Sequence, residues 1–239
     1  MVCLISRKPM IFPIKYLKPT LCNTAADGWS MFDLHGIPET LFAAMVKITL
    51  LHGNPDISQR RSLLREIYDM VQGWINTEEA FGTDHTVHAI DKSDRYHLAE
   101  TWRCGILLYL SRAFPSYSPA SRIANTVSLA NSTLSHITCI NGETTIRKQI
   151  FLPLFLAGSE VDFSVSRDFC REYCRFFSGS RGYKDLENSC GYGMFANAAE
   201  LLEEIWAERD VVGNGPWWGD IVDRNTKDFN GLESQFLFG

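Results

Sequence analysis

One polar stretch of the sequence, residues 76–92, and the position just after it hold the densest set of possible metal ligands. Imidazole and carboxylate groups can share a zinc or iron ion, and here they occur at Asp84, His85, His88, Asp91 and Asp94. No further ligand at a recognised spacing completes the set. We therefore interpret the stretch as a polar surface loop and predict no bound metal and no other cofactor.

Motifs of the common enzyme classes are missing from the sequence. It has no nucleophile elbow, no phosphate-cradling glycine loop followed by lysine and threonine, and no histidine-glutamate zinc helix. Helical enzymes need not carry these motifs, so their absence only lowers the expectation of catalysis. We predict that the chain is not an enzyme and has no catalytic residues, with a metal-dependent helical enzyme built on the Asp84–Asp94 loop as the alternative.

The cysteines favour packing over metal binding or disulfide formation. Cys170 and Cys174 lie one helical turn apart, so both sulfurs could face one ion, but a structural zinc site needs four ligands. The seven cysteines are odd in number and scattered, unlike the paired framework of a small secreted domain. Reduced thiols in an intracellular compartment fit this pattern better.

Aromatic residues form a second kind of candidate site, because aromatic walls bury apolar ligands and leave polar tips to orient them. The candidates for contact with a ligand or a partner are Trp102, Tyr109, Phe155, Trp206, Trp217 and Trp218. Each of them, taken singly, is more simply explained as a core residue, since aromatic side chains are normally buried for stability.

The charge balance argues against a protein that coats nucleic acid. The 23 basic and 28 acidic side chains give a net charge of −5, the wrong sign for a strong phosphate-binding face. Residues 1–20 contain no acidic residue and four basic ones, at Arg7, Lys8, Lys15 and Lys18. A basic arm thus precedes an acidic body, and we do not expect this chain to bind DNA tightly by itself.

Apolar runs are too short for a membrane span or an export signal. The longest, residues 150–158, contains Pro153, whereas a bilayer span needs about 20 apolar residues. Charged residues and prolines interrupt the basic arm, so we expect no secretion signal.

Apolar residues recur at the helical spacings of 3 and 4 in segment after segment, while sustained alternation of period 2 is absent. We therefore predict an all-α fold, a compact multi-helix bundle of antiparallel helix pairs. The predicted helices cover about residues 38–53, 58–74, 94–114, 119–140, 150–158, 165–176 and 194–206.

Three local details of these helices are also predicted. Ser93 and Asp94 are expected to cap the third helix, since their side chains can accept from first-turn N–H groups. The helix over residues 150–158 is expected to bend at Pro153. In the sixth helix the inward stripe is expected to consist of Val165, Phe169, Tyr173 and Phe176.

Four segments, taken together and in order, match a known pattern. They are residues 34–42, residues 96–110, residues 152–160 and residues 201–210. The third, which reads Leu-Pro-Leu-Phe-Leu-Ala-Gly-Ser-Glu, is the most specific, and the fourth ends in Ile205-Trp206 and Arg209-Asp210. In this order the segments resemble the fungal-specific transcription factor domain, which lies C-terminal to a six-cysteine zinc cluster in many fungal regulators.

The resemblance covers about residues 34–218 and implies an all-helical regulatory region that tunes an attached DNA-binding domain. Some related regions bind apolar small molecules, and no catalytic residues are implied. We predict three parts: a basic, poorly structured arm (1–33), the regulatory domain (34–218) and a C-terminal tail (219–239). The zinc cluster needs six closely spaced cysteines, and only Cys3 and Cys22 lie near the start.

Two explanations for the missing cluster stay open. The chain is either a shortened product or fragment of a longer factor, or a stand-alone regulator that pairs with a complete one. In both cases we predict a regulatory and interaction domain in the nucleus, or in cytoplasm and nucleus, that reaches DNA only indirectly and does not bind membranes.

The expected partners are other protein chains, namely a full-length factor or a second copy, or an apolar small molecule. A stand-alone small-molecule-binding protein is the further alternative. Missing upstream helices would leave an apolar face uncovered, so we also predict oligomerisation or poor solubility of the chain alone.

Overall fold

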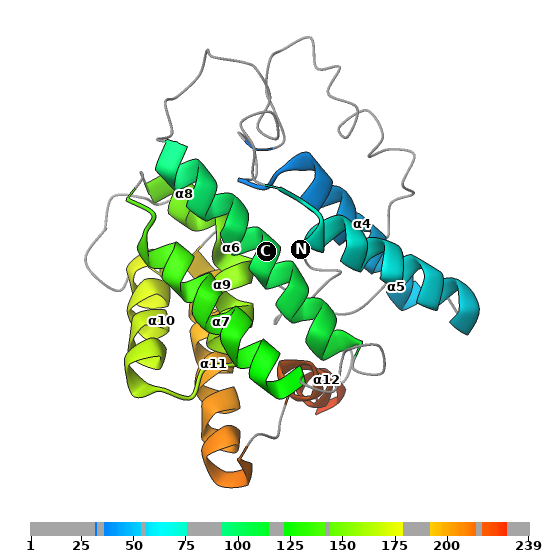
Figure 1. The fold of residues 1–239 in the computed structure, drawn as a ribbon. Helices are drawn as coiled ribbons and strands as arrows, with labels where there is room; N and C mark the ends of the chain where they lie inside the picture. The colour runs from blue at the N-terminus through cyan, green and yellow to red at the C-terminus, as the bar shows by residue number, and fades with distance from the viewer. Residues whose placement is uncertain are drawn as a thin grey trace.

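The computed structural model describes Phe32 and residues 36–53, 56–75, 92–114, 122–141, 144–178, 192–213 and 217–228. Throughout these ranges the regular elements are α-helices, without a strand (Figure 1). The all-α prediction is confirmed. The helices are α4 (Glu39–Gly53), α5 (Ile57–Gln72), α6 (Lys92–Ala113), α7 (Arg122–Thr138), α8 (Thr144–Gln149), α9 (Phe151–Gly158), α10 (Ser164–Phe177), α11 (Tyr192–Val212) and α12 (Trp218–Asp228).

Three helix pairs are arranged around α9. Helices α4 and α5 pack together on one side of α6, while α7 lies along α6 and both contact α9 (Figure 1). Helices α10 and α11 form the third pair and close the other side of α9. The α10–α11 pair is antiparallel, because Arg167 near the start of α10 meets Asp210 near the end of α11. The predicted antiparallel pairing is thus confirmed.

The amphipathic pattern of α5 shows how the sequence produces these helices. Asp56 caps the helix, since its Oδ1 accepts the backbone N–H groups of Ser58 and Gln59. The spacing of Leu64, Ile67, Val71 and Trp74 predicts that they face inward; the first three are buried and Trp74 is half-buried. Apolar residues at these spacings form a single stripe, which α5 buries against its neighbours.

The proline of α9 does not bend the helix as predicted. The break lies at Ile150, between α8 and α9, and Pro153 occupies the first turn of α9. First-turn N–H groups have no acceptor within their own helix, so a residue without an N–H loses nothing there. All eight residues of α9 are buried, which makes it the centre of the core.

Two side-chain predictions were wrong. The buried residues of α10 are Cys170, Cys174 and Phe177, while Val165 and Phe176 are exposed. The prediction followed large apolar residues and overlooked that a thiol packs as a small hydrophobic group.

Asp94 does not cap α6, because the helix already begins at Lys92. It is buried, and its Oδ1 accepts the backbone N–H of Asn141 at 2.9 Å. This bond ties the start of α6 to the residues just after α7, so the pair is antiparallel and its ends are joined.

Helix α12 extends regular structure to Asp228, within the segment predicted as tail. The division of the chain into 1–33, 34–218 and 219–239 stays a prediction, since most of the arm and the last residues lie outside the described ranges. No helix in those ranges is long and apolar enough to cross a membrane.

Helix α6 passes close to α9 at Gly105. A Cβ atom at this position would lie 3.1 Å from the Cβ and 3.2 Å from the Cα of Pro153. We expect Gly105→Val to destabilise the domain by about 1–3 kcal/mol through overpacking, measured by urea unfolding. Ala113→Val, at the end of the same helix, carries the same β-branched side chain and is the control. Equal losses in the two variants would contradict a close approach at Gly105.

Candidate functional site

The four family-like segments meet one another in the fold. Gly36, with a φ of 65°, packs on Leu98 so closely that a Cβ atom there would lie 3.0 Å from the leucine side chain. This contact joins the first segment to the second, and Gly105 on Pro153 joins the second to the third. The residues that carry the resemblance are therefore those that hold the helix pairs together.

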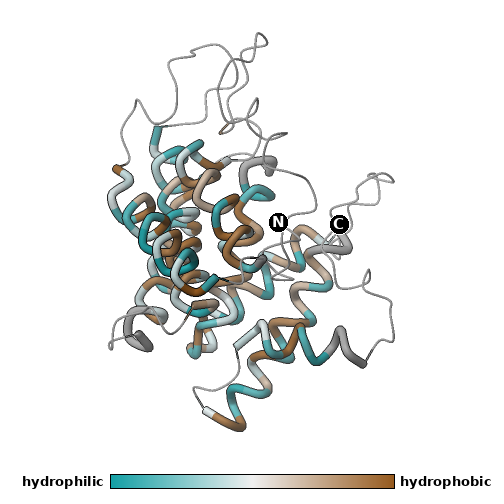
Figure 2. The backbone as a smooth tube through the Cα atoms, turned by 90° about the vertical axis from the view of Figure 1, so that its right-hand side faces the viewer, coloured by the Kyte–Doolittle hydropathy of each residue, from teal (hydrophilic) through white to brown (hydrophobic). Residues whose placement is uncertain are grey.

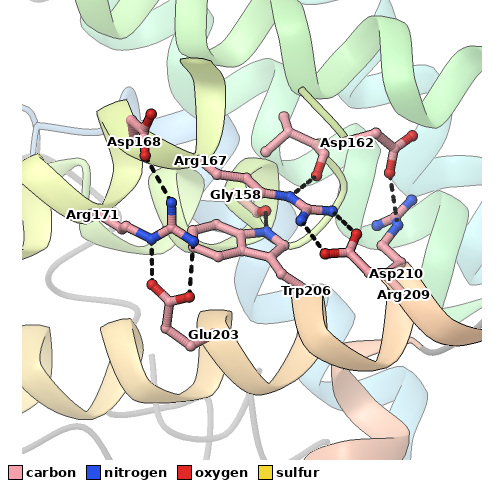
Figure 3. A network of polar contacts seen from close by, with 10 residues as sticks. Gly158, Asp162, Arg167, Asp168, Arg171, Glu203, Trp206, Arg209 and Asp210 are labelled. Atoms are coloured by element: carbon pink, nitrogen blue, oxygen red, sulfur yellow. Dashed lines mark hydrogen bonds and ion pairs between the residues drawn. The ribbon is translucent and has the colours of Figure 1, made fainter. Parts of the chain in front are cut away.

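The third and fourth segments are joined by hydrogen bonds (Figure 3). Trp206 Nε1 of α11 donates to the carbonyl oxygen of Gly158 at 2.8 Å, and the bond is buried. Arg209, one turn later, donates to the carbonyl oxygen of Ser159. Both carbonyls lie at the C-terminal end of α9. The last four carbonyl groups of a helix have no N–H donor within the helix. Helix α11 thus supplies the donors that the end of α9 lacks.

A buried carboxylate lies at the same place. Glu160 is 2% exposed, and its Oε1 lies 2.7 Å from Arg112 Nε of α6. Its Oε2 lies 3.4 Å from Arg209 of α11. Burial raises the pKa of Glu160, and the two guanidinium groups oppose this rise. The carboxylate therefore links α6, α9 and α11 through one charge cluster.

A more exposed ladder of ion pairs joins α10 to α11 around Trp206 (Figure 3). Arg167 forms a two-bond pair with Asp210 at 2.8 Å for each bond, and Arg171 pairs with Glu203. The guanidinium carbons of Arg167 and Arg171 lie 5.6 and 4.8 Å from the Trp206 ring centroid, within cation–π range. The Arg171 guanidinium lowers the pKa of Glu203, and Arg167 lowers that of Asp210.

The six predicted aromatic residues do not form one cluster. Tyr109 and Phe155 contact the Trp218 ring, with centroid distances of 5.9 and 6.0 Å, and Trp217 lies beside Trp218 at 5.2 Å. Trp206 lies apart from these rings, against the guanidinium groups of Arg167 and Arg171. Trp217 is half-buried, and the other five are buried.

Trp102 and Tyr109 line a small apolar cavity between α4, α6 and α9. Its other walls include Met45, Ile106 and Leu152, and its volume is about 10 Å³. Ligand pockets usually measure about 300–1,000 Å³. This cavity is therefore far too small for a metabolite while the helices keep this packing.

Four of the five predicted metal ligands, Asp84, His85, His88 and Asp91, lie outside the described residues. The fifth, Asp94, is engaged with Asn141. Where the structure describes the chain, no group of three or more histidine, cysteine, aspartate or glutamate side chains could hold a metal ion.

Cys170 and Cys174 are free, buried thiols. Burial raises the pKa of each to about 12, so both are neutral thiols at neutral pH. Cys170 Sγ would lie 3.1 Å from a Cβ atom at Gly158, which shows that this thiol fills space beside α9.

Sequence reasoning missed the charge cluster and the arginine ladder. Glu160 and Arg209 entered the sequence prediction only as members of the four segments that resemble the family. Arg112, Arg167 and Arg171 did not enter it. One signal was present: Glu160 lies two positions after the apolar run 150–158, where an acidic residue needs a partner if it is buried.

Fold and site together define the class, an all-helical domain whose helix pairs are held together by buried polar bonds. The comparisons give the particular family. The sequence matches the family model described as the fungal specific transcription factor domain over residues 1–231, and the chain belongs to this family. It is a regulatory domain and not an enzyme. No curated protein and no solved structure matches the chain.

Proposed function

We propose that this regulatory domain acts by contact with a second copy of the same domain, and not by enclosing an apolar ligand. One observation supports the proposal. Four large apolar side chains are exposed at one end of the α10–α11 pair: Phe163 (69%), Val165 (79%), Val211 (85%) and Val212 (70%). We call these four residues the apolar end.

Ion pairs hold the apolar end in place. Arg209 Nε lies 3.1 Å from Asp162, directly before Phe163, and Arg167 is bonded to Asp210, directly before Val211. In Figure 2 the free end of α11, the lowest part of the view, is coloured as hydrophobic. A fixed apolar surface loses little conformational entropy when it is covered, which favours association.

The chemistry of the apolar end fits a second copy. Among the described residues, the acids directly before Phe163 and Val211 are Asp162 and Asp210, and each is paired with an arginine, so this part of the surface offers apolar contact between neutralised charges. In a two-fold dimer the same patch meets itself, which requires such a neutral, self-complementary surface. The small cavity beside Trp102 supports the choice against a small-molecule ligand.

Under this proposal the domain acts in the nucleus, where it reaches DNA through a factor that carries the same kind of domain. A full-length factor would then be bound by the same apolar end, in place of the second copy. Residues 34–218 are proposed as the minimal regulatory unit, with α12 as an addition to it.

Self-association is tested by analytical ultracentrifugation of the full chain. We expect a concentration-dependent dimer, and we expect the double variant Phe163→Asp/Val211→Asp to weaken it, because each copy would bring unpaired carboxylates into an apolar contact. Ile57→Asp/Ile75→Asp, which changes two equally exposed apolar residues of the α5 region, is the matched control. A wild-type monomer at about 1 mM, which would mean an affinity weaker than about −4 kcal/mol, contradicts the proposal.

A further inference from the structure

Two histidines from different helices face each other across the α6–α7 pair. The Nδ1 atoms of His97 and His136 lie 2.9 Å apart, and the ring centroids are 5.2 Å apart. Both side chains are half-buried. Neither residue belongs to the polar loop that the sequence marked for metal binding.

This contact constrains the two rings chemically. An imidazole Nδ1 carries either a lone pair or a hydrogen, so two equal Nδ1 groups at this distance repel each other. The contact is favourable only if one ring donates to the other or if both lone pairs bind an electrophile. Neutral imidazole is a preferred ligand of zinc, copper and nickel ions.

We propose that His97 and His136 bind one divalent ion of the zinc and nickel class through their Nδ1 atoms. Zinc, with metal–nitrogen bonds of about 2.0–2.1 Å in a tetrahedral arrangement, puts the two nitrogens about 3.4 Å apart, so the rings would have to separate by about half an ångström, which small side-chain rotations supply. Bonds of the same length at the right angles of a nickel site put the nitrogens about 2.9 Å apart. Water fills the other coordination positions, as in an open metal site.

The two helices hold these ligands ready. Helices α6 and α7 are packed along their length, and the bond between Asp94 and Asn141 fixes them at the same end as the histidines. Tyr96 restricts both rings, with centroid distances of 5.2 Å to His97 and 6.0 Å to His136. Ligands that are already oriented lose less entropy on binding.

The surroundings admit a cation. His136 lies in an open groove on α7 whose other walls are mostly hydroxyl and amide groups, which gives an ion a path to the rings: Val127, Ser128, Asn131, Ser132 and Ser135. Among the described residues, the charged side chains that act on His136 are Glu100, which attracts a cation, and Arg103, which repels one. These two side chains pair with each other at 2.8 Å, so their effects largely cancel.

The test is an isothermal titration calorimetry experiment in which nickel chloride is added to the full, chelator-treated chain. Nickel is chosen because imidazole suits it, whereas thiolates compete for zinc and copper. We expect one bound equivalent and a higher melting temperature with nickel, since an ion that binds only the folded state stabilises it. Circular dichroism confirms that each variant is folded before it is titrated.

Two single variants and one double variant identify the site. Losing an outer-shell partner already weakens metal affinity about 10–100-fold, so His97→Gln and His136→Gln should each weaken nickel binding at least tenfold. His85→Gln/His88→Gln, in the polar loop, should bind nickel as the wild type does.

Three results would overturn the proposal. They are wild-type affinity in both single variants, loss of binding in the His85/His88 variant alone, and a wild-type chain that takes up no nickel at millimolar concentration. The last result would show that the histidine contact is a hydrogen bond only.

Discussion

Replacing Arg209 with alanine is expected to destabilise the domain by about 3 kcal/mol, because it removes one of the two guanidinium groups that pair with the buried Glu160, while Arg112 still holds the carboxylate. Arg209 is buried, and Glu160, which it faces, is 2% exposed. The variant also removes the donor to the Ser159 carbonyl and the contact with Asp162. The free energy of unfolding, from urea denaturation followed by circular dichroism, measures the effect.

Two further variants show whether the buried charge is the cause. Arg224→Ala breaks an exposed pair with Glu208 and should cost less than about 1 kcal/mol. Arg209→Lys keeps a positive charge near Glu160 and should cost less than Arg209→Ala. Equal costs for Arg209→Ala and Arg224→Ala, or for Arg209→Lys and Arg209→Ala, would contradict this account of Glu160.

Replacing Trp218 with alanine is expected to cost about 3–5 kcal/mol, because it removes a large buried side chain and leaves a cavity. Trp218 is 1% exposed and packs on Tyr109 and Phe155 from two other helices. It is also the first residue of α12, so its loss weakens the attachment of that helix. Differential scanning calorimetry should show a fall in melting temperature of about 10 °C, at 2–4 °C per kcal/mol for a chain of this size.

The neighbouring tryptophan is the matched control for Trp218. Trp217 is half-buried, so Trp217→Ala should lower the melting temperature by less than half as much. Trp218→Phe, which keeps an aromatic ring, should fall between the two. A larger fall in melting temperature from Trp217→Ala than from Trp218→Ala would mean that Trp217, and not Trp218, anchors α12.

The helices with long apolar stripes could be predicted from the sequence, and two others could not. Helix α11 was predicted from Ala198, Leu201 and Ile205, all of which are buried. Helix α12 offers only a few apolar positions in eleven residues, and α8 is a polar helix of six residues. Short helices of this kind depend on tertiary contacts, which periodicity does not reveal.

The candidate site was predictable only in part, for a related reason. The four segments can be recognised from their amino-acid sequence, but the hydrogen bonds and ion pairs between them depend on how the helices pack. Arg112 and Glu160 are 48 positions apart and belong to α6 and to the end of α9. A single sequence does not indicate which of 23 basic side chains meets a given buried acid. The histidine pair was missed likewise, because His97 and His136 are 39 positions apart.

Two sets of ion pairs attach α11 to its neighbours, and they respond differently to salt concentration. The pairs of Arg167 and Arg171 face water, where electrostatic attraction is screened over about 8 Å at physiological ionic strength and over about 3 Å in 1 M salt. The Glu160 cluster is shielded from water, so counterions reach it poorly. High salt therefore loosens α10 at the rim while the junction of α6, α9 and α11 stays closed.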